Sequence, residues 1–543
     1  MGPTVERRLW WRVFGLLVLA CSAWALALPA MTGPDEAANA IRGAAVARGQ
    51  WTGDALPETV DGEAWWGNVM VEVEVPASFA DAEVIAACFK GVPREQFIDL
   101  EPRPRRGDCP ELTGVRLDEA TTTTYEYRGQ PFFYLLTGLP TLVSVDDGGV
   151  WGMRLAGLLL CSALLASAFV SPLRLAARAR LPVLLGALVA VSPMVLHLAS
   201  TQNAAGLEIA ASLCLWAAGL ALVAGPHAPD GRLVRRAGVA ATVLVLTRGL
   251  SPGFAALTLL VLLAVARPGR VRELLGRTDV RVWLGGVAAA TAVTGAWLVH
   301  IHEAFPLPPT ETTGLAAAWG RVPVWVQGMI AEFGSTDVIP PVALHWAWGA
   351  AAAVVLGLAV ALGSRRHALL ALGLVAVGIA IAISGEGFGV PQTGFWWQGR
   401  YVLPCVVGAL LLAPAGIRDG DGDGGRRSFL RPATWTVLGV FVAGHVWAFA
   451  YSMRHYTVGP DGPATPGRFL LHPVWSPPLH PALLTAVFTA AVAGLALLLW
   501  HTATSTAGDD DVAVTVAVAG EIAGDDAAAV DYRPASISAG KGG

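Results

Sequence analysis

Long apolar stretches recur along the whole chain and constrain its fold more than any other feature. Stretches of roughly 17–25 residues are sufficient for an α-helix to cross about 30 Å of hydrocarbon. Of the 543 residues, 54% are hydrophobic and only 14% are charged, whereas a soluble domain has roughly 25% charged residues. The sequence predicts an all-α polytopic membrane protein with about 12 transmembrane helices, at residues 13–30, 150–172, 181–199, 206–224, 236–250, 252–266, 282–300, 344–363, 368–384, 401–416, 433–451 and 481–500.

The arginines are sorted between alternate loops, and this sorting predicts the orientation of the spans. With Arg7 and Arg8 in the cytoplasm, every second loop is basic, while the short loops on the other side carry only Arg248, Arg321, Arg400, Arg454 and Arg468. We therefore expect both termini in the cytoplasm and the protein in the plasma (cell inner) membrane. The basic loops hold Arg174, Arg178 and Arg180; Arg232, Arg235 and Arg236; Arg267, Arg270, Arg272, Arg277 and Arg281; Arg365 and Arg366; and Arg418, Arg426, Arg427 and Arg431.

Two parts of this topology have alternatives. The motif TRGLSPG divides the apolar block 236–266, and a single helix there would place the loop with five arginines outside, so we favour two helices. The first span could be a cleaved signal peptide, because Ala25-Leu26-Ala27 has the small-x-small pattern of a cleavage site. We favour a retained helix, because the apolar run is long and further spans follow it.

One loop differs from the others, since residues 31–149 form a long polar insertion. VMVEVEVPA alternates valines with Glu72 and Glu74 as a half-buried strand does, and TTTTYEYRG predicts a second strand. The aromatic stretch 129–149 predicts a short helix at the membrane interface. We expect a cytoplasmic N-terminus at 1–12, the first transmembrane helix at 13–30, an extracytoplasmic loop of mixed α/β character at 31–149, a bundle of about 11 helices at 150–500 and a disordered acidic cytoplasmic tail at 501–543.

Two of the six cysteines, Cys88 and Cys109, lie in this loop. Disulfides persist outside the cytoplasm, so the predicted location favours a bond between them. The bond would close a loop of about 20 residues and contribute roughly 3 kcal/mol in the chain-entropy description. The alternative is that they are two unrelated thiols.

Adjacent acids, Asp35 and Glu36, follow the first span, where desolvation of a carboxylate is costly. One interpretation is that Asp35 caps a helix that starts after Gly33-Pro34. The other is that one carboxylate is a general base that takes a proton from a hydroxyl. Both could also bind a divalent cation such as Mg or Mn through oxygen.

Arginines on the same predicted outer side suggest an anionic partner, because positive charge is disfavoured there. Arg400, followed by Tyr401, and Arg248 could bind a phosphate through the guanidinium fork. Alternatively, Arg400 could pair with Glu386 or a headgroup, and Arg248 could simply extend to the interface. The other candidates on this side are Glu208, an acid inside a span that needs a partner, Asn203, Gln398, His197, which could be a helix-end histidine, and Arg154, which could be structural.

Several motifs together resemble one family of predicted membrane proteins, domain-of-unknown-function family 2142, which is grouped with the GT-C glycosyltransferases. They are GPDEAANAIRGAAVARGQW, QPFFYLLTGLP, GMRLAGLLLCSALL, SPMVLHLASTQNAAGLEIAASLCLWA and WWQGRYVLP, and the resemblance covers residues 10 to about 500. The family's Asp-Glu-x-x-His pattern appears here as Asp35-Glu36-Ala37-Ala38-Asn39, so Asn39 stands in place of the histidine.

The resemblance implies a GT-C-like fold and a polyprenyl-phosphate sugar as donor. It also implies that Asp35 is the catalytic acid residue and that Arg400 or Arg248 binds the donor phosphate. The predicted reaction moves a sugar to an extracytoplasmic cell-envelope glycan or lipid acceptor, with membrane lipids around the bundle.

A multi-span transporter or flippase of a lipid-linked substrate would fit the number of spans equally well. Its acids would be expected at the bilayer midplane, whereas here they gather at one face. An adhesion module on a membrane anchor would not need twelve spans. Nucleic-acid binding has no support, because the sequence contains no concentrated basic face.

Overall fold

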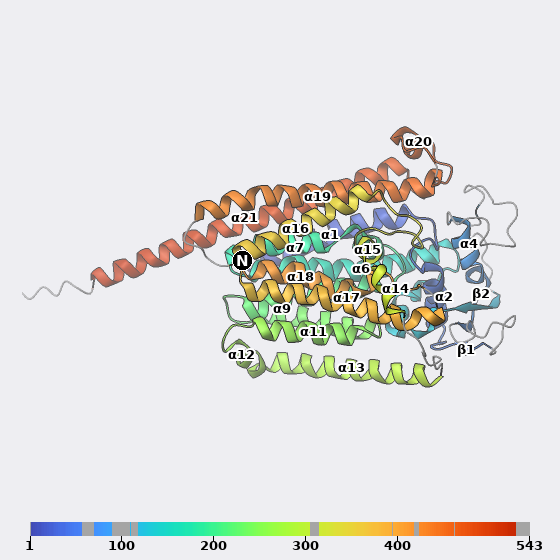
Figure 1. Ribbon diagram of the computed structural model, residues 1–543, viewed down its shortest axis with the longest axis horizontal. Helices are drawn as coiled ribbons and strands as arrows, with labels where there is room; N and C mark the ends of the chain where they lie inside the picture. The colour runs from blue at the N-terminus through green and yellow to red at the C-terminus, as the bar shows by residue number, and fades with distance from the viewer. Residues whose placement is uncertain are drawn as a thin grey trace, which may run out of the picture.

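The computed structural model describes residues 2–56, 70–89, 109, 118–304, 314–393, 395–417, 423–460 and 462–527. Long helices run side by side along the molecule, and a small cap of short helices and strands covers one end of them (Figure 1). The N-terminus lies at the opposite end. The described chain is therefore mostly helical, as the sequence predicts.

Among the described residues, eight helices are long and apolar enough to cross a membrane, or up to nine if one bent pair counts as a single span. In α9 the apolar window is 94% buried, whereas in α13 it is 11% buried, so α9 is central and α13 is peripheral. The eight are α1 (Pro3–Leu26), α6 (Asp147–Val170), α9 (Ala204–Ala224), α13 (Thr278–Ala304), α16 (Val342–Leu362), α17 (Arg365–Thr393), α19 (Asp423–Val458) and α21 (Pro481–Ala527).

Each of the twelve predicted segments coincides with at least one helix, but not all of these helices are long enough to span a membrane alone. The first helix also begins earlier than predicted, at Pro3, and ends at Leu26. The number of spans therefore stays a prediction. The shorter helices are α7 (Ala177–Ala190), α8 (Pro193–Ala199), α10 (Gly231–Thr247), α11 (Ser251–Val265) and α18 (Leu403–Ala415).

Two breaks in the bundle follow from local sequence. The segment 181–199, predicted as one helix, is bent by 66° between α7 and α8. Pro193 lacks an N–H and disfavours helical backbone at Ser192, so the helix stops before it. The block 236–266 forms two helices, which confirms the two-helix interpretation, and Arg248 is the residue at the end of α10.

The cap contains one antiparallel sheet in the order β1-β2-β3, formed by β1 (Asp54–Ala55), β2 (Val71–Pro76) and β3 (Glu119–Thr124). The alternation predicted for β2 is confirmed, because Val71, Val73 and Val75 are buried while Glu74 is exposed. The second predicted strand ends sooner than expected, at Thr124, where a 3₁₀ turn, η4 (Glu126–Arg128), follows.

Short helices join the sheet to the bundle. Helix α2 (Glu36–Ala47) contacts α4, α5 and β2 and is buried along nearly its whole length. A short helix is present within 129–149, as predicted, at α5 (Pro131–Thr137). The remaining elements are α3 (Ala77–Ala80), α4 (Ala82–Phe89), η5 (Leu139–Leu142), η6 (Ser171–Arg174), α12 (Arg270–Gly276), α14 (Leu315–Gly320), α15 (Val322–Ile330), η7 (Gly399–Val402) and α20 (Pro466–Leu471).

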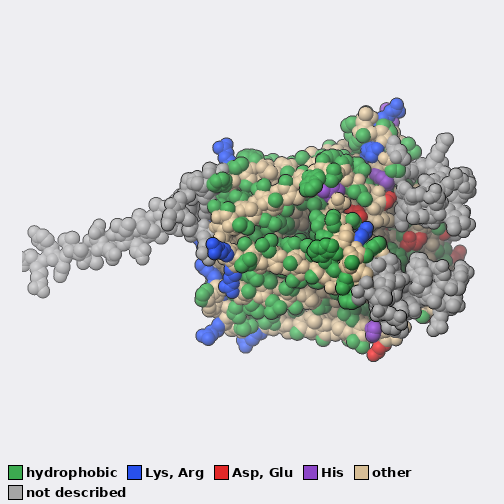
Figure 2. Space-filling view, in the orientation of Figure 1, with side chains coloured by type: hydrophobic (Ala, Val, Ile, Leu, Met, Phe, Trp, Pro, Cys, Tyr) green, Lys and Arg blue, Asp and Glu red, His purple; other side chains and the backbone are tan. Residues whose placement is uncertain are grey.

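The last helix extends away from the bundle, past the boundary predicted at residue 500 (Figure 1). The segment predicted as a disordered tail is thus helical up to Ala527, and residues 528–543 lie outside the described residues. On the face shown in Figure 2, most of the basic side chains gather at the end that holds the N-terminus, and apolar side chains cover the length of the bundle.

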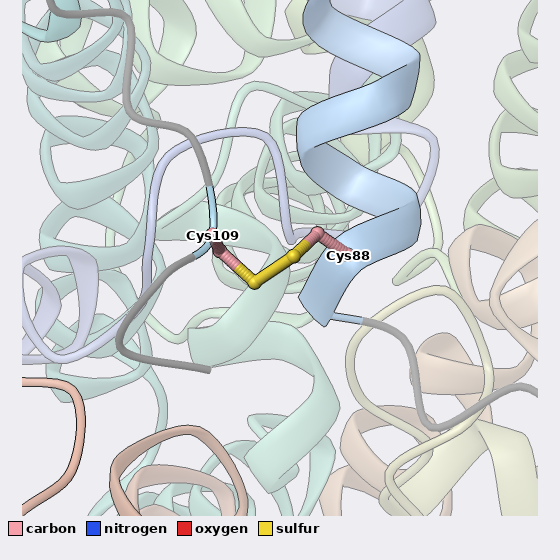
Figure 3. Close-up of a disulfide and its surroundings, with 2 residues drawn as sticks. All are labelled: Cys88 and Cys109. Carbon is pink, nitrogen blue, oxygen red and sulfur yellow. A yellow bond between two sulfur atoms is a disulfide. The ribbon is translucent and has the colours of Figure 1, made fainter. Parts of the chain in front are cut away.

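A disulfide joins Cys88, at the end of α4, to Cys109 (Figure 3). The two residues are separated by 21 positions, so the bond closes a short loop within the cap. The other four cysteines, Cys21, Cys161, Cys214 and Cys405, are buried and unbridged.

Non-reducing peptide mapping of the protein in native membranes should recover Cys88 and Cys109 in one linked fragment. The expected result follows if the cap lies outside the cytoplasm, where a disulfide persists. The buried thiols of Cys21 and Cys161 are the internal control, because they should label only after unfolding. Finding Cys88 and Cys109 as free thiols would contradict both the bond and the orientation.

Candidate functional site

A small cavity lies where α2 and η4 of the cap meet the ends of α9 and α10 and the η7 turn. Its volume is about 20 Å³. Five residues predicted from the sequence line it, namely Asp35, Asn203, Arg248, Arg400 and Tyr401. Asn39, Glu126, Tyr134 and Thr247 complete the polar part of the lining.

Asp35 has an unusual backbone conformation at the start of α2. Its φ is 52°, in the left-handed region, which costs a non-glycine residue of order 1–2 kcal/mol and which Asp and Asn tolerate best. Its side chain makes no capping hydrogen bond, so the capping interpretation is wrong. One carboxylate oxygen instead accepts from Arg400, and the other lies 3.1 Å from the Tyr125 hydroxyl that donates to it.

Arg400 is the most deeply buried cation of the cavity, with 2% of its side chain exposed. One terminal nitrogen donates to Asp35, but Nε and Nη1 have no hydrogen-bond acceptor among the described residues. An unpaired buried donor is costly, especially on a charged group. The unpaired Nε and Nη1 of Arg400, a residue that lines the cavity, therefore make it a candidate anion-binding group.

Two guanidinium groups face the same aromatic ring. Arg248 lies 4.6 Å and Arg400 5.2 Å from the centroid of the Tyr401 ring. The ring face attracts both cations and holds them near each other despite their like charge. Both guanidinium groups also line the cavity, so they bring two positive charges to it.

Glu208, which is not part of the cavity lining, forms an ion pair with Arg248. Its Oε2 lies 3.7 Å from Arg248 Nη1, and its Oε1 accepts a hydrogen bond of 2.6 Å from the Ser251 hydroxyl. The buried acid therefore has the partner that the sequence required for it, and Arg248 is held at the cavity by a fixed charge.

Glu386 does not pair with Arg400, so that predicted alternative is wrong. Its Oε2 accepts a hydrogen bond of 2.5 Å from the backbone N–H of Trp397. This contact holds the segment that leads into η7. Gly399 completes the turn, because an added Cβ there would lie 2.0 Å from the carbonyl oxygen of Trp325, and the position thus requires glycine.

Glu126 is a cavity residue that the sequence interpretation missed. It lies on η4, and burial, followed by the charge of Asp35 beside it, raises the pKa of the Glu126 carboxyl. Its Oε2 lies 3.4 Å from the Tyr134 hydroxyl, which also donates to Asn39 at 2.6 Å. Proton uptake by Glu126 would remove one negative charge from the cavity that Arg248 and Arg400 line.

Glu36 points away from the cavity and into a closed network. Arg154 donates to its two oxygens at 2.7 and 2.5 Å, and the backbone N–H groups of Gln202 and Gly33 donate at 2.9 Å each. Burial alone would raise the pKa of Glu36, but the charge and hydrogen bonds of Arg154 outweigh it and lower the pKa. The other N–H groups of Arg154 donate hydrogen bonds to the backbone carbonyls of Ala25, Leu28 and Pro29.

The network assigns Glu36 and Arg154 a structural role, in which they join the end of α1 to α2 and to the start of α9. Replacing Glu36 with Gln should therefore destabilise the fold by about 1–3 kcal/mol, because it leaves the buried Arg154 with fewer acceptors. We expect a lower midpoint of thermal unfolding in detergent with a normal rate per folded molecule. A selective loss of rate at normal stability would contradict this assignment.

The predicted cation between Asp35 and Glu36 does not fit these residues. The Glu36 oxygens are already used by four protein donors, and Asp35 faces Arg400 on the other side of the chain. Within the described ranges, no group of three or more His, Cys, Asp and Glu side chains could hold a metal ion. We therefore derive no metal-dependent step.

Of the three remaining predicted residues, Asn203 lines the cavity, whereas His197 and Gln398 do not. The Asn203 amide donates to the carbonyl of Pro34 at 2.6 Å, which fixes the loop before Asp35. His197 is buried between aromatic rings, 5.6 Å from Trp24 and 4.9 Å from Phe333 by ring centroids, and does not line the cavity. Gln398 immediately precedes η7 and is not part of the lining either.

Comparison with known proteins gives one family and two similar structures. The crystal structure of ArnT from Cupriavidus metallidurans in the apo state is similar at 14% identity and a TM-score of 0.41, over 89% of this chain and 76% of that chain. The structure of the same ArnT bound to undecaprenyl phosphate is similar at 15% identity and a TM-score of 0.42, over 91% and 77%. No curated protein matches the chain. The model of the family described as Predicted membrane protein (DUF2142) matches residues 16–409, and the chain belongs to this family.

Proposed function

We propose that this protein is a membrane glycosyltransferase of GT-C type. It would move a sugar from a polyprenyl-phosphate donor to a cell-envelope glycan or lipid acceptor. The observation that carries the proposal is the buried Arg400, which contacts the carboxylate of Asp35 and has two guanidinium nitrogens, Nε and Nη1, without acceptors among the described residues. A cation fork next to a carboxylate meets the two needs of such a transfer, a phosphate site and a proton acceptor.

The chemistry assigns one role to each group. The acceptor oxygen attacks the anomeric carbon of the donor sugar and gives its proton to Asp35. The bond between that carbon and the phosphate oxygen breaks, and the electron pair leaves with the polyprenyl phosphate. Arg400, together with Arg248 at the same Tyr401 ring, offsets the negative charge on the departing phosphate.

Arg400 also fixes where Asp35 lies relative to the donor. It contacts the Asp35 carboxylate, while its Nε and Nη1 have no acceptor among the described residues and could bind a phosphate. A phosphate held there would lie beside the proposed proton acceptor.

We further propose the predicted membrane arrangement for this enzyme. Twelve spans would place both termini in the cytoplasm, and residues 31–149 with the Asp35 cavity would be extracytoplasmic, in the plasma membrane. Support comes from the arginine-rich end of the bundle, which lies opposite the cap (Figure 2). The same proposal has the helical bundle begin at residue 150 and end at residue 500.

Incubation of the purified full chain with radiolabelled polyprenyl-phosphate sugars and membrane extracts as acceptor tests the function. We expect labelled sugar to move into a glycan or lipid product, and polyprenyl phosphate to be released. A flippase would instead move the intact labelled lipid between leaflets of a sealed vesicle without breaking its sugar–phosphate bond. Lipid movement without release of the phosphate would overturn the proposed activity.

A further inference from the structure

A second cavity lies at the other end of the bundle, between the beginning of α1 and the beginning of α10. Its volume is about 500 Å³, far larger than the cavity at Asp35. Helix α10 runs from this cavity to Arg248, and the 13 positions from Arg235 to Arg248 span about 20 Å along a helix. The two cavities are therefore separate sites at opposite ends of α10.

One buried acid organises the wall of this second cavity. Glu6 has 2% of its side chain exposed and contacts three arginines, Arg174, Arg232 and Arg236. The Arg236 contact is 2.8 Å and the Arg232 contact is 3.8 Å. Asp230 also contacts Arg174, at 3.2 Å, so two carboxylates face three guanidinium groups and one positive charge remains in excess.

The cavity lining as a whole has more positive than negative charge. It contains four arginines, Arg7, Arg232, Arg235 and Arg236, against the single carboxylate of Glu6, which leaves three positive charges in excess. Arg7 and Arg235 are exposed and make no ion pair with any described residue. Such a cluster attracts an anion, and guanidinium forks suit a phosphate.

The rest of the lining is aromatic and apolar, which points to an amphiphile rather than a free ion. Trp10 is fixed by a hydrogen bond of 2.9 Å from its indole N–H to the Ser167 hydroxyl. Trp11 and Val239 are 58% and 38% exposed, so the cavity opens beside apolar side chains on the flank of the bundle. Tryptophan favours the level of lipid headgroups in a membrane.

We infer that this cavity binds the phosphate headgroup of an anionic phospholipid, with an acyl chain along the flank of α10. A bare basic loop would need neither a cavity of this size nor a buried acid that holds two arginines, Arg232 and Arg236, in its wall. The inference is independent of the proposed transferase activity, because it uses none of the residues at Asp35.

Native mass spectrometry of the detergent-purified full chain, titrated with phosphatidylglycerol or phosphatidylcholine, tests the site. Wild type should retain phosphatidylglycerol preferentially. The double variant Arg7→Gln/Arg235→Gln should retain it about tenfold less well, because two positive charges that attract the headgroup phosphate are removed. Both side chains are exposed, so the variant should fold normally, which size-exclusion chromatography would check.

The matched control is Arg365→Gln/Arg366→Gln, which removes two arginines at the start of α17 that do not line the cavity. It should bind phosphatidylglycerol like wild type. Equal retention by the Arg7/Arg235 variant and wild type would overturn the inference, as would equal binding of the two lipids. Displacement of the lipid by inorganic phosphate as effectively as by added phosphatidylglycerol would also overturn it, since the site would then bind a free ion.

Discussion

Replacing Asp35 with Asn is expected to lower sugar transfer by about 10²–10⁴-fold, the usual contribution of a positioned general base. The protein should still fold, because Asn tolerates the left-handed backbone at this position as well as Asp does. Asn also keeps a side-chain oxygen that can accept from Arg400. Only the proton acceptor is lost, so the rate of transfer from the radiolabelled donor is the measurement.

A measurement of donor binding by the Asp35→Asn variant distinguishes this catalytic role from a structural one. The Asp35→Asn variant should bind polyprenyl phosphate at least as tightly as wild type, because Arg400 loses a competing negative charge. Asp54→Asn is the matched control, since Asp54 is exposed on β1 and makes no part of the cavity. If Asp35→Asn transferred sugar at the wild-type rate, Asp35 could not be the base.

Much of the fold could be predicted because it depends on local patterns. Apolar length alone locates the helices, and the alternation of Val71, Val73 and Val75 locates β2. The break at Arg248 was also predictable, since the charge on neighbouring loops favours two helices there. Each of these features is encoded within a few residues of itself.

The site was predictable only in part, because its geometry depends on contacts between distant segments. Asp35 and Arg400 are 365 positions apart, and no periodicity in the sequence relates them. Glu126 was missed for a different reason. Its segment was interpreted as a strand, whereas the chain turns into η4 after Thr124 and brings the carboxylate to the cavity.

The contacts of the neighbouring acids Asp35 and Glu36 could not be predicted from the sequence either. Sequence interpretation placed Asp35 and Glu36 in one site, because neighbouring carboxylates at a membrane boundary share a plausible function. The left-handed backbone at Asp35 sends the two side chains to different partners, Arg400 for Asp35 and Arg154 for Glu36. A single unusual φ angle thus divides a predicted pair into one cavity residue and one structural residue.

Replacing Arg400 tests whether its guanidinium group binds the donor phosphate. Arg400→Ala should cost about 2–4 kcal/mol of transition-state stabilisation, the usual loss when a buried charge-stabilising donor is removed. Asp35 is 23% exposed and can be hydrated, so the loss of its partner should leave the fold intact. The measurement is kcat/KM for the donor, with thermal unfolding in detergent as the check on stability.

The conservative variant Arg400→Lys distinguishes a fork from a point charge. Lysine can keep the ion pair with Asp35 but cannot supply the unpaired N–H groups that Nε and Nη1 present. Binding of the donor should therefore fall while the proton step is retained, so KM should change more than kcat. Arg468→Ala is the control, because Arg468 is an exposed arginine on α20 at the same end of the molecule. If Arg400→Ala turned over donor at the wild-type rate, the buried guanidinium would serve packing alone, and the phosphate would have to be held by Arg248 without it.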